Sequence, residues 1–272
     1  MEAARVSLPD VFHLPRNAMA VLAERPRPAS SARREMAETL RTVISALLIA
    51  LVLRTVFFQP FTIPSSSMEP GLVTGDYVLV SKYSYGWSRA SLPLNPPLPP
   101  GRFLFRPPQR GDVVVFRLPR DPRVAYVKRL IGLPGDRIQV WHGMVLVNDR
   151  AIPRTPLGEA PDHDDPLRPV QRVAERLPGR APYVTYDAGS GHDGDDTGVY
   201  VVPAGHYFMM GDNRDNSLDS RWPRQVGVGF VPADDLIGKA QVVLLSWRPG
   251  VSIFKPWTWL DLQTDRFLHR VR

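Results

Sequence analysis

The longest apolar stretch of the chain lies near its N-terminus, where residues 42–58 read TVISALLIALVLRTVFF. It has no polar face, as expected of a helix surrounded by lipid. A membrane span needs about 20 residues, so we predict a transmembrane helix over residues 38–60, in which Arg54 extends toward the headgroups. The alternatives are a buried core helix and a cleaved secretory signal. The latter is disfavoured because about 40 residues precede the apolar run.

The charges around this segment predict its orientation. Three arginines precede the apolar run, whereas no Lys or Arg occurs between residues 59 and 81. Positive residues are retained on the cytoplasmic side of a span. We therefore predict that residues 1–37 form a cytoplasmic tail and that residues 61–272 form an extracytoplasmic domain. The three arginines are Arg33, Arg34 and Arg41.

Beyond the apolar segment, the pattern changes to short runs rich in Val, Ile and aromatic residues, bounded by Gly, Pro or Asp. Such runs are typical of strands, and His142–Gly143 between two of them predicts a tight hairpin turn. We therefore predict a mainly β fold whose strands pair over long distances. The predicted strands are residues 76–81, 112–116, 124–131, 137–141, 144–148, 199–202, 206–210 and 240–246.

Two regions lack this pattern. Residues 92–110 are rich in Pro and predict an extended loop. Residues 152–197 are rich in Pro, Asp, Arg and Gly with little apolar periodicity, which indicates an insertion that forms a small subdomain or a long loop. The chain contains 29 Pro, which argues against a mostly helical fold because Pro removes a backbone donor and clashes inside helices.

Composition narrows the chemistry. The chain has no Cys, which excludes disulfides, thiolate catalysis and Cys-ligated metals. Its net charge of +7, mostly from Arg, favours anionic partners such as nucleic acid or lipid. However, the charge forms no dense basic run and is typical of an Arg-rich genome. We therefore predict no nucleic-acid partner.

A cluster of three serines directly follows the membrane segment, in PSSSMEPGL at residues 64–72. Serines between prolines are usually only a turn. Their position is more informative than their type, because a nucleophile beside a bilayer can act on a substrate held there.

Lys128 lies in AYVKRLIGLPGDRI, residues 125–138. Strand alternation places Lys128 on an apolar face, opposite to Arg129. Burial lowers the pKa of a lysine, and a neutral amine can take the proton of a serine hydroxyl. The alternative is a lysine that extends from a sheet edge or pairs with a carboxylate.

The third segment, GDNRDNSLDSRWP at residues 211–223, is rich in Asp and Asn. Such runs form loops that bond their own backbone. This one resembles an acidic metal loop, but it lacks the closing Glu of a calcium loop, and Arg214 and Arg221 would repel a cation. We therefore predict no metal site.

Together with RGDVVVF at residues 110–116, these segments resemble, in the same order, the motifs of bacterial type I signal peptidases, or leader peptidases. The resemblance covers residues 47–239, with residues 152–197 as the family's variable insertion. It implies a signal-peptidase-like antiparallel β catalytic domain, which here follows the one predicted N-terminal transmembrane helix. It also implies cleavage of secretory preproteins after small residues at −1 and −3, often Ala-X-Ala, without metal or organic cofactor.

The resemblance also implies roles for individual residues. Ser67, directly before Met68, matches the nucleophile, and Lys128 matches its general base. The supporting positions are Ser65, which forms the oxyanion hole with the backbone N–H of Ser67; Ser217, which orients the lysine amine; and Asp219 with Arg221, an ion pair that holds this segment near the site.

Other functions remain to be weighed. A Ser-His-Asp site is disfavoured because none of the six His lies in these motifs. A self-cleaving repressor-type protease would carry a DNA-binding domain where this chain has its apolar segment. A specialised relative with a single substrate and a non-enzymatic membrane-tethered β module stay open. The family implies a protein of the bacterial cytoplasmic (inner) membrane, with a periplasmic catalytic domain and with membrane lipid and preproteins as partners. Its best-known Gram-negative member has two spans, whereas the single apolar segment here predicts a single-pass protein.

Overall fold

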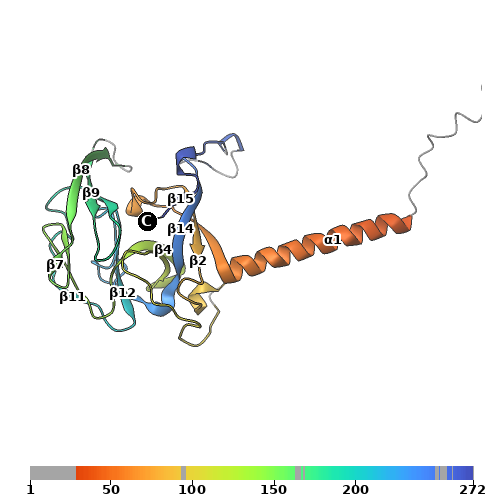
Figure 1. Cartoon of the computed structure of the whole chain (residues 1–272), viewed down its shortest axis with the longest axis horizontal. Helices are drawn as coiled ribbons and strands as arrows, with labels where there is room; N and C mark the ends of the chain where they lie inside the picture. Colours follow the sequence, from red (N-terminus) through yellow and green to blue (C-terminus); the bar gives the residue numbers. More distant parts are fainter. Residues whose placement is uncertain are drawn as a thin grey trace, which may run out of the picture. The chain divides into compact units, whose positions relative to one another are not determined.

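The computed structural model describes residues 29–92, 96–162, 167, 169–248, 251, 256–258 and 260–271. Most of the predicted cytoplasmic tail, residues 1–28, lies outside this part of the chain. The protein divides into two compact units, Met1–Ile49 and Ala50–Arg272. Each unit is described separately (Figure 1).

The described part of the first unit is helical: it belongs to helix α1, Ala29–Val52, which continues into a π-helical turn, η1, at Leu53–Phe57. The stretch Arg33–Phe57 is long and apolar enough to cross a membrane, and none of its apolar window is buried. A core helix of a soluble domain would show the opposite. The helix ends before residue 60 because Phe58 adopts an extended backbone, φ −134° and ψ 147°, and begins the first strand.

The second unit is built mainly from antiparallel strands, as predicted. Its largest sheet has the strand order β1-β2-β14-β3-β4-β12-β13, with β15 paired to β14. Strands far apart in the sequence are therefore neighbours, since β14 lies between β2 and β3. The bounds are β1 Phe58–Thr62, β2 Asp76–Ser81, β3 Val113–Leu118, β4 Asp121–Gly132, β12 His206–Met210, β13 Val231–Pro232, β14 Leu236–Ser246 and β15 His269–Arg270.

A second sheet, of order β11-β5-β6-β7, contains the predicted hairpin. His142 and Gly143 both have positive φ, 47° and 71°, as a two-residue type I′ turn requires. Strand β5 pairs with β6 directly across this turn, with Trp141 opposite Met144. The bounds are β5 Arg137–Trp141, β6 Met144–Val147, β7 Arg150–Ala151 and β11 Tyr200–Val201.

The predicted insertion, residues 152–197, forms a small subdomain. It contains a three-stranded antiparallel sheet of β8 Arg154–Pro161, β9 Pro169–Glu175 and β10 Tyr183–Asp187. Strand β8 is almost entirely exposed, so its sequence carries no apolar alternation. This sheet is drawn in green to cyan at the edge of the second unit (Figure 1).

Gly132 lies where three core side chains meet. A Cβ at this position would lie 2.8 Å from Ile138, 2.9 Å from Phe208 and 3.0 Å from Val202. We expect Gly132→Ala to lower the free energy of unfolding by about 1–3 kcal/mol, the usual cost of overpacking. Urea unfolding would measure the change. Gly198→Ala is the matched control, since a Cβ there meets nothing within 4 Å; equal midpoints for the two variants would contradict the prediction.

Candidate active site

The three serines of residues 65–67 lie on a tight turn directly after β1. Ser66–Met68 forms a 3-10 turn, and the side chain of Met68 is fully buried in a core cluster with Leu72. This burial fixes the turn, while Ser65 and Ser67 line an open cleft. Ser65 Oγ lies 3.4 Å from Ser67 Oγ.

Lys128 reaches this turn from β4. Lys128 is only 3% exposed, and its Nζ is hydrogen-bonded to Ser67 Oγ at 2.5 Å. The strand register places Lys128 opposite Val114 of β3, so apolar neighbours flank its stem. The structure therefore brings together the predicted nucleophile and the predicted base.

The surroundings of Lys128 favour a neutral amine. Burial lowers the pKa of Lys128 to about 8, against 10.5 for an unperturbed lysine. The carboxylates of Asp219 and Asp212 raise the pKa, and the Arg221 guanidinium lowers it again. Desolvation is the dominant effect, so a useful fraction of the amine is unprotonated near neutral pH.

Asp219 and Arg221 form the predicted ion pair. Arg221 donates from Nε to Asp219 Oδ1 at 2.9 Å and from Nη2 to Asp219 Oδ2 at 3.0 Å. Burial alone would raise the pKa of Asp219, but Arg221 and the backbone N–H of Gly211 outweigh it and hold that pKa below its usual value. Asp219 therefore remains a carboxylate beside Lys128.

Ser217 lines the same cleft and is 7% exposed. Its Oγ has no hydrogen-bond partner among the described residues, so the predicted bond to the lysine amine is not formed in this structure. A Cβ on Gly211 would lie 2.3 Å from Ser217 Oγ and 2.5 Å from Ser67 O. Only glycine at residue 211 therefore allows the two segments to approach so closely, and the orienting role of Ser217 stays a prediction.

The sequence did not predict a second buried ion pair, which lies on the opposite face of β4 from Lys128. Arg129, on the opposite face of β4, binds Asp212 through two hydrogen bonds of 2.7 and 2.6 Å. The two side chains are 3% and 1% exposed. The adjacent positions of Lys128 and Arg129 were the available signal, because alternation sends one residue to each face of the strand.

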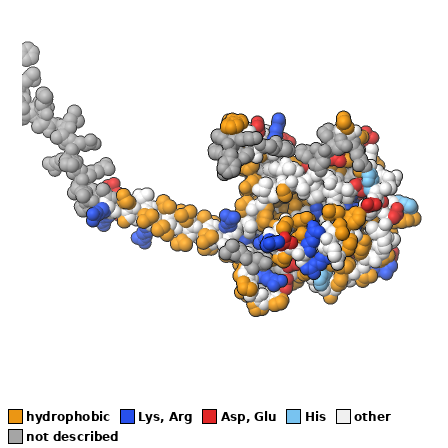
Figure 2. Space-filling model, turned by 180° about the vertical axis from the view of Figure 1, so that it is seen from behind, with side chains coloured by type: hydrophobic (Ala, Val, Ile, Leu, Met, Phe, Trp, Pro, Cys, Tyr) orange, Lys and Arg blue, Asp and Glu red, His pale blue; other side chains and the backbone are white. Residues whose placement is uncertain are grey.

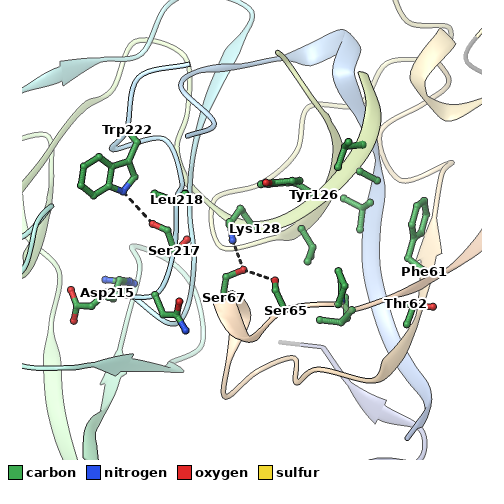
Figure 3. Close-up of a pocket in the computed structure, with 18 of the residues that line it drawn as sticks. Phe61, Thr62, Ser65, Ser67, Tyr126, Lys128, Asp215, Ser217, Leu218 and Trp222 are labelled. Carbon is green, nitrogen blue, oxygen red and sulfur yellow. Dashed lines mark hydrogen bonds between the residues drawn. The ribbon is translucent and has the colours of Figure 1, made fainter. Parts of the chain in front are cut away.

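The cleft around this site has a volume of about 580 Å³. Figure 3 shows Ser67 and Lys128 in its middle, with Phe61 and Thr62 toward one end and Asp215 and Trp222 toward the other. The end near β1 is apolar and is lined by Phe61, Ile63, Val115, Ala125 and Val127. The opposite end is mostly polar.

Comparisons with known proteins identify the family of the chain. The family model described as "Signal peptidase, peptidase S26" matches residues 36–247. The signal peptidase I of Rickettsia typhi is 42% identical over 228 residues, which cover 77% of this chain and 84% of the relative. The signal peptidase I of Rickettsia canadensis is 40% identical over the same coverage.

A solved structure is also similar to part of the chain. The crystal structure of a signal peptidase I from Enterococcus faecalis shares 24% sequence identity and covers 49% of this chain and 97% of its own, with a TM-score of 0.29. The assignment depends on the family model and on the Rickettsia relatives, which match most of the chain. The chain therefore belongs to the signal peptidase family, peptidase S26, whose members are serine proteases that cleave signal peptides.

Proposed function

We propose that this protein removes signal peptides from exported preproteins with Ser67 as nucleophile and Lys128 as general base. The contact between Ser67 Oγ and the Nζ of a buried lysine carries the proposal. A hydroxyl needs a base to attack a carbonyl carbon, and Lys128 with its lowered pKa is in contact with this hydroxyl.

The reaction follows from these positions. Neutral Lys128 takes the proton of Ser67 as Oγ attacks the scissile carbonyl, and the resulting ammonium then protonates the departing amine. Ser65 and the backbone N–H of Ser67 donate hydrogen bonds to the oxyanion. A water molecule, deprotonated by the same lysine, then attacks the acyl-enzyme, and the ammonium returns the proton to Ser67 Oγ as the ester bond breaks. The ion pair of Asp219 and Arg221 would hold its segment beside the lysine, and the hydroxyl of Ser217 would orient the amine.

The apolar end of the cleft supports the proposed preference for small residues at −1 and −3. It is continuous with β1, which follows directly from the apolar helix. Alternate residues of an extended peptide point to the same side, so the side chains at −1 and −3 would both point into the apolar end of the cleft. The side chains of Ile63, Val115 and Val127 line this end of the cleft, and in this proposal they restrict it to side chains as small as that of alanine.

The proposed location is the bacterial cytoplasmic (inner) membrane. The apolar part of the helix Arg33–Phe57, from residue 38 on, would cross it once, with residues 1–37 in the cytoplasm and residues 61–272 in the periplasm. Membrane lipid and secretory preproteins would then be the partners. The basic residues before the helix support this orientation, and no nucleic acid is required.

Cleavage of a preprotein series tests this function. The purified full chain in detergent micelles is expected to cleave a preprotein with Ala at −1 and −3, and to cleave the same substrate with Leu at −1 at least about tenfold more slowly, since the larger side chain does not fit. Mass spectrometry would locate the cleaved bond. Leu at −2 is the matched control and should change little; equal rates for all three substrates would contradict the proposed specificity.

A further inference from the structure

The insertion is in direct contact with the catalytic segment. The backbone of residues 212–214 lies beside β10 in a parallel bridge between Tyr186 and Asn213. Tyr186 N donates to Asp212 O at 2.9 Å, and Arg214 N donates to Tyr186 O at 2.9 Å. The segment thus extends the three-stranded sheet of the insertion by one short strand.

The other side of the same segment holds the nucleophile turn. Asn213 N donates to Ser67 O at 3.2 Å, and Asn213 Nδ2 donates to Ser66 O at 3.3 Å. Asn216 Nδ2 donates to Ser66 Oγ at 3.0 Å. Residues 212–214 are therefore bonded to the insertion on one side and to the main chain of the nucleophile on the other, so a displacement of one contact would displace the other.

A buried ion pair locks this arrangement. Arg214 donates from Nη1 to Glu175 Oε1 at 2.8 Å and from Nη2 to Glu175 Oε2 at 2.5 Å. Glu175, at the end of β9, is fully buried, and Arg214 is 5% exposed. Tyr183 OH also donates to Glu175 Oε2, at 2.9 Å. The same guanidinium donates from Nε to Gly211 O at 3.2 Å, which fixes the backbone next to the Asp212 carboxylate.

We propose that Glu175 of the insertion is a positioning residue for the reaction: through Arg214 it holds residues 211–216 in the place where Asn213 fixes the main chain of Ser67. This inference rests on the proposed role of Ser67. The insertion then serves as a support of the active site. A bidentate, fully buried carboxylate–guanidinium pair gives the directional constraint that this task needs.

Steady-state kinetics of the full chain in micelles tests the proposal. Glu175→Gln keeps the shape of the side chain but removes its charge, and we expect kcat per titrated active site to fall roughly 10- to 100-fold with KM within about twofold, as a misplaced nucleophile predicts. Glu159→Gln is the matched control, because Glu159 lies exposed on β8 of the same sheet and should change neither constant.

A double variant separates positioning from stability. Glu175→Met with Arg214→Met replaces the buried pair by apolar side chains of similar length, a change that often preserves or raises stability. If the double variant had the unfolding midpoint of the native enzyme but kept the low kcat of Glu175→Gln, the result would support a positioning role for Glu175. Normal kcat in the double variant, or in Glu175→Gln counted per active site, would overturn it. Cleavage by Ser67→Ala would instead refute the proposed nucleophile, so the two failures are distinguishable.

Discussion

Ser67→Ala is expected to reduce cleavage of an Ala-X-Ala preprotein by roughly 10⁴-fold or more, because the reaction then has no acyl-forming oxygen. Met68 is fully buried and holds the turn, so the substitution should leave the fold unchanged. Single-turnover cleavage in micelles, followed on gels, would measure the loss. An unchanged unfolding midpoint would show that the loss is chemical.

The two neighbouring serines provide matched controls. Ser65 lines the cleft, and Ser65→Ala should cost about 10²–10³ in kcat, as for other oxyanion-hole donors. Ser66 is buried at 4% exposure and accepts a hydrogen bond from Asn216, so Ser66→Ala should have the smallest effect of the three. If Ser66→Ala instead removed activity while Ser67→Ala retained it, the nucleophile would be misassigned.

The parts of the fold that local patterns determine could be predicted from the sequence. Alternation along 124–131 placed Lys128 and Arg129 on opposite faces of a strand, and the structure shows both arrangements, with Lys128 at Ser67 and Arg129 at Asp212. His142–Gly143 was recognisable as a turn because two residues with positive φ favour such sequences. These features depend on neighbours in the chain.

The contacts that complete the site could not be predicted, because they join distant residues. Glu175 and Arg214 are 39 positions apart and Arg129 and Asp212 are 83 apart, and neither Glu175 nor Asp212 differs in sequence from a surface acid. The sheet of the insertion escaped detection for another reason. Its strand β8 is exposed on both faces and so carries no apolar alternation.

The partners of long charged side chains could not be predicted from the sequence either. On the face drawn in Figure 2, Lys and Arg side chains of the second unit lie among apolar patches. Arg214 and Arg221 look equivalent in the sequence, since each follows an Asp and a small polar residue, in DNR and DSR. Both are buried, but their partners differ: Arg221 pairs with Asp219 and Arg214 with Glu175.

Lys128→Ala is expected to reduce kcat about as much as Ser67→Ala, because the two residues act as one unit and their losses do not add. The double variant should therefore be no slower than either single variant. Single-turnover cleavage at saturating preprotein would measure all three. A Lys128→Ala enzyme within about tenfold of the native rate would show that another group removes the proton.

The pH dependence of kcat/KM identifies the base independently. The active form has a neutral Lys128, so the rate should rise with pH through an acidic limb near the pKa of about 8 and level off above it. With that pKa, roughly one-tenth of the amine is neutral at pH 7, against about one part in 3,000 for an unperturbed lysine of pKa 10.5. A limb below about pH 5 would contradict a lysine base, since even deeply buried lysines rarely titrate lower.

The shift of the acidic limb in Asp219→Asn distinguishes Lys128 from any other titrating group. The Asp219 carboxylate raises the pKa of Lys128 and Arg221 lowers it. In Asp219→Asn the opposing cation remains while the favourable charge is lost, so the pKa falls and the acidic limb moves to lower pH, even though the maximal rate also falls. The position of the limb does not depend on the amount of folded enzyme. A limb that stays in place in Asp219→Asn would therefore mean that the group in control of the rate is not the amine beside Asp219.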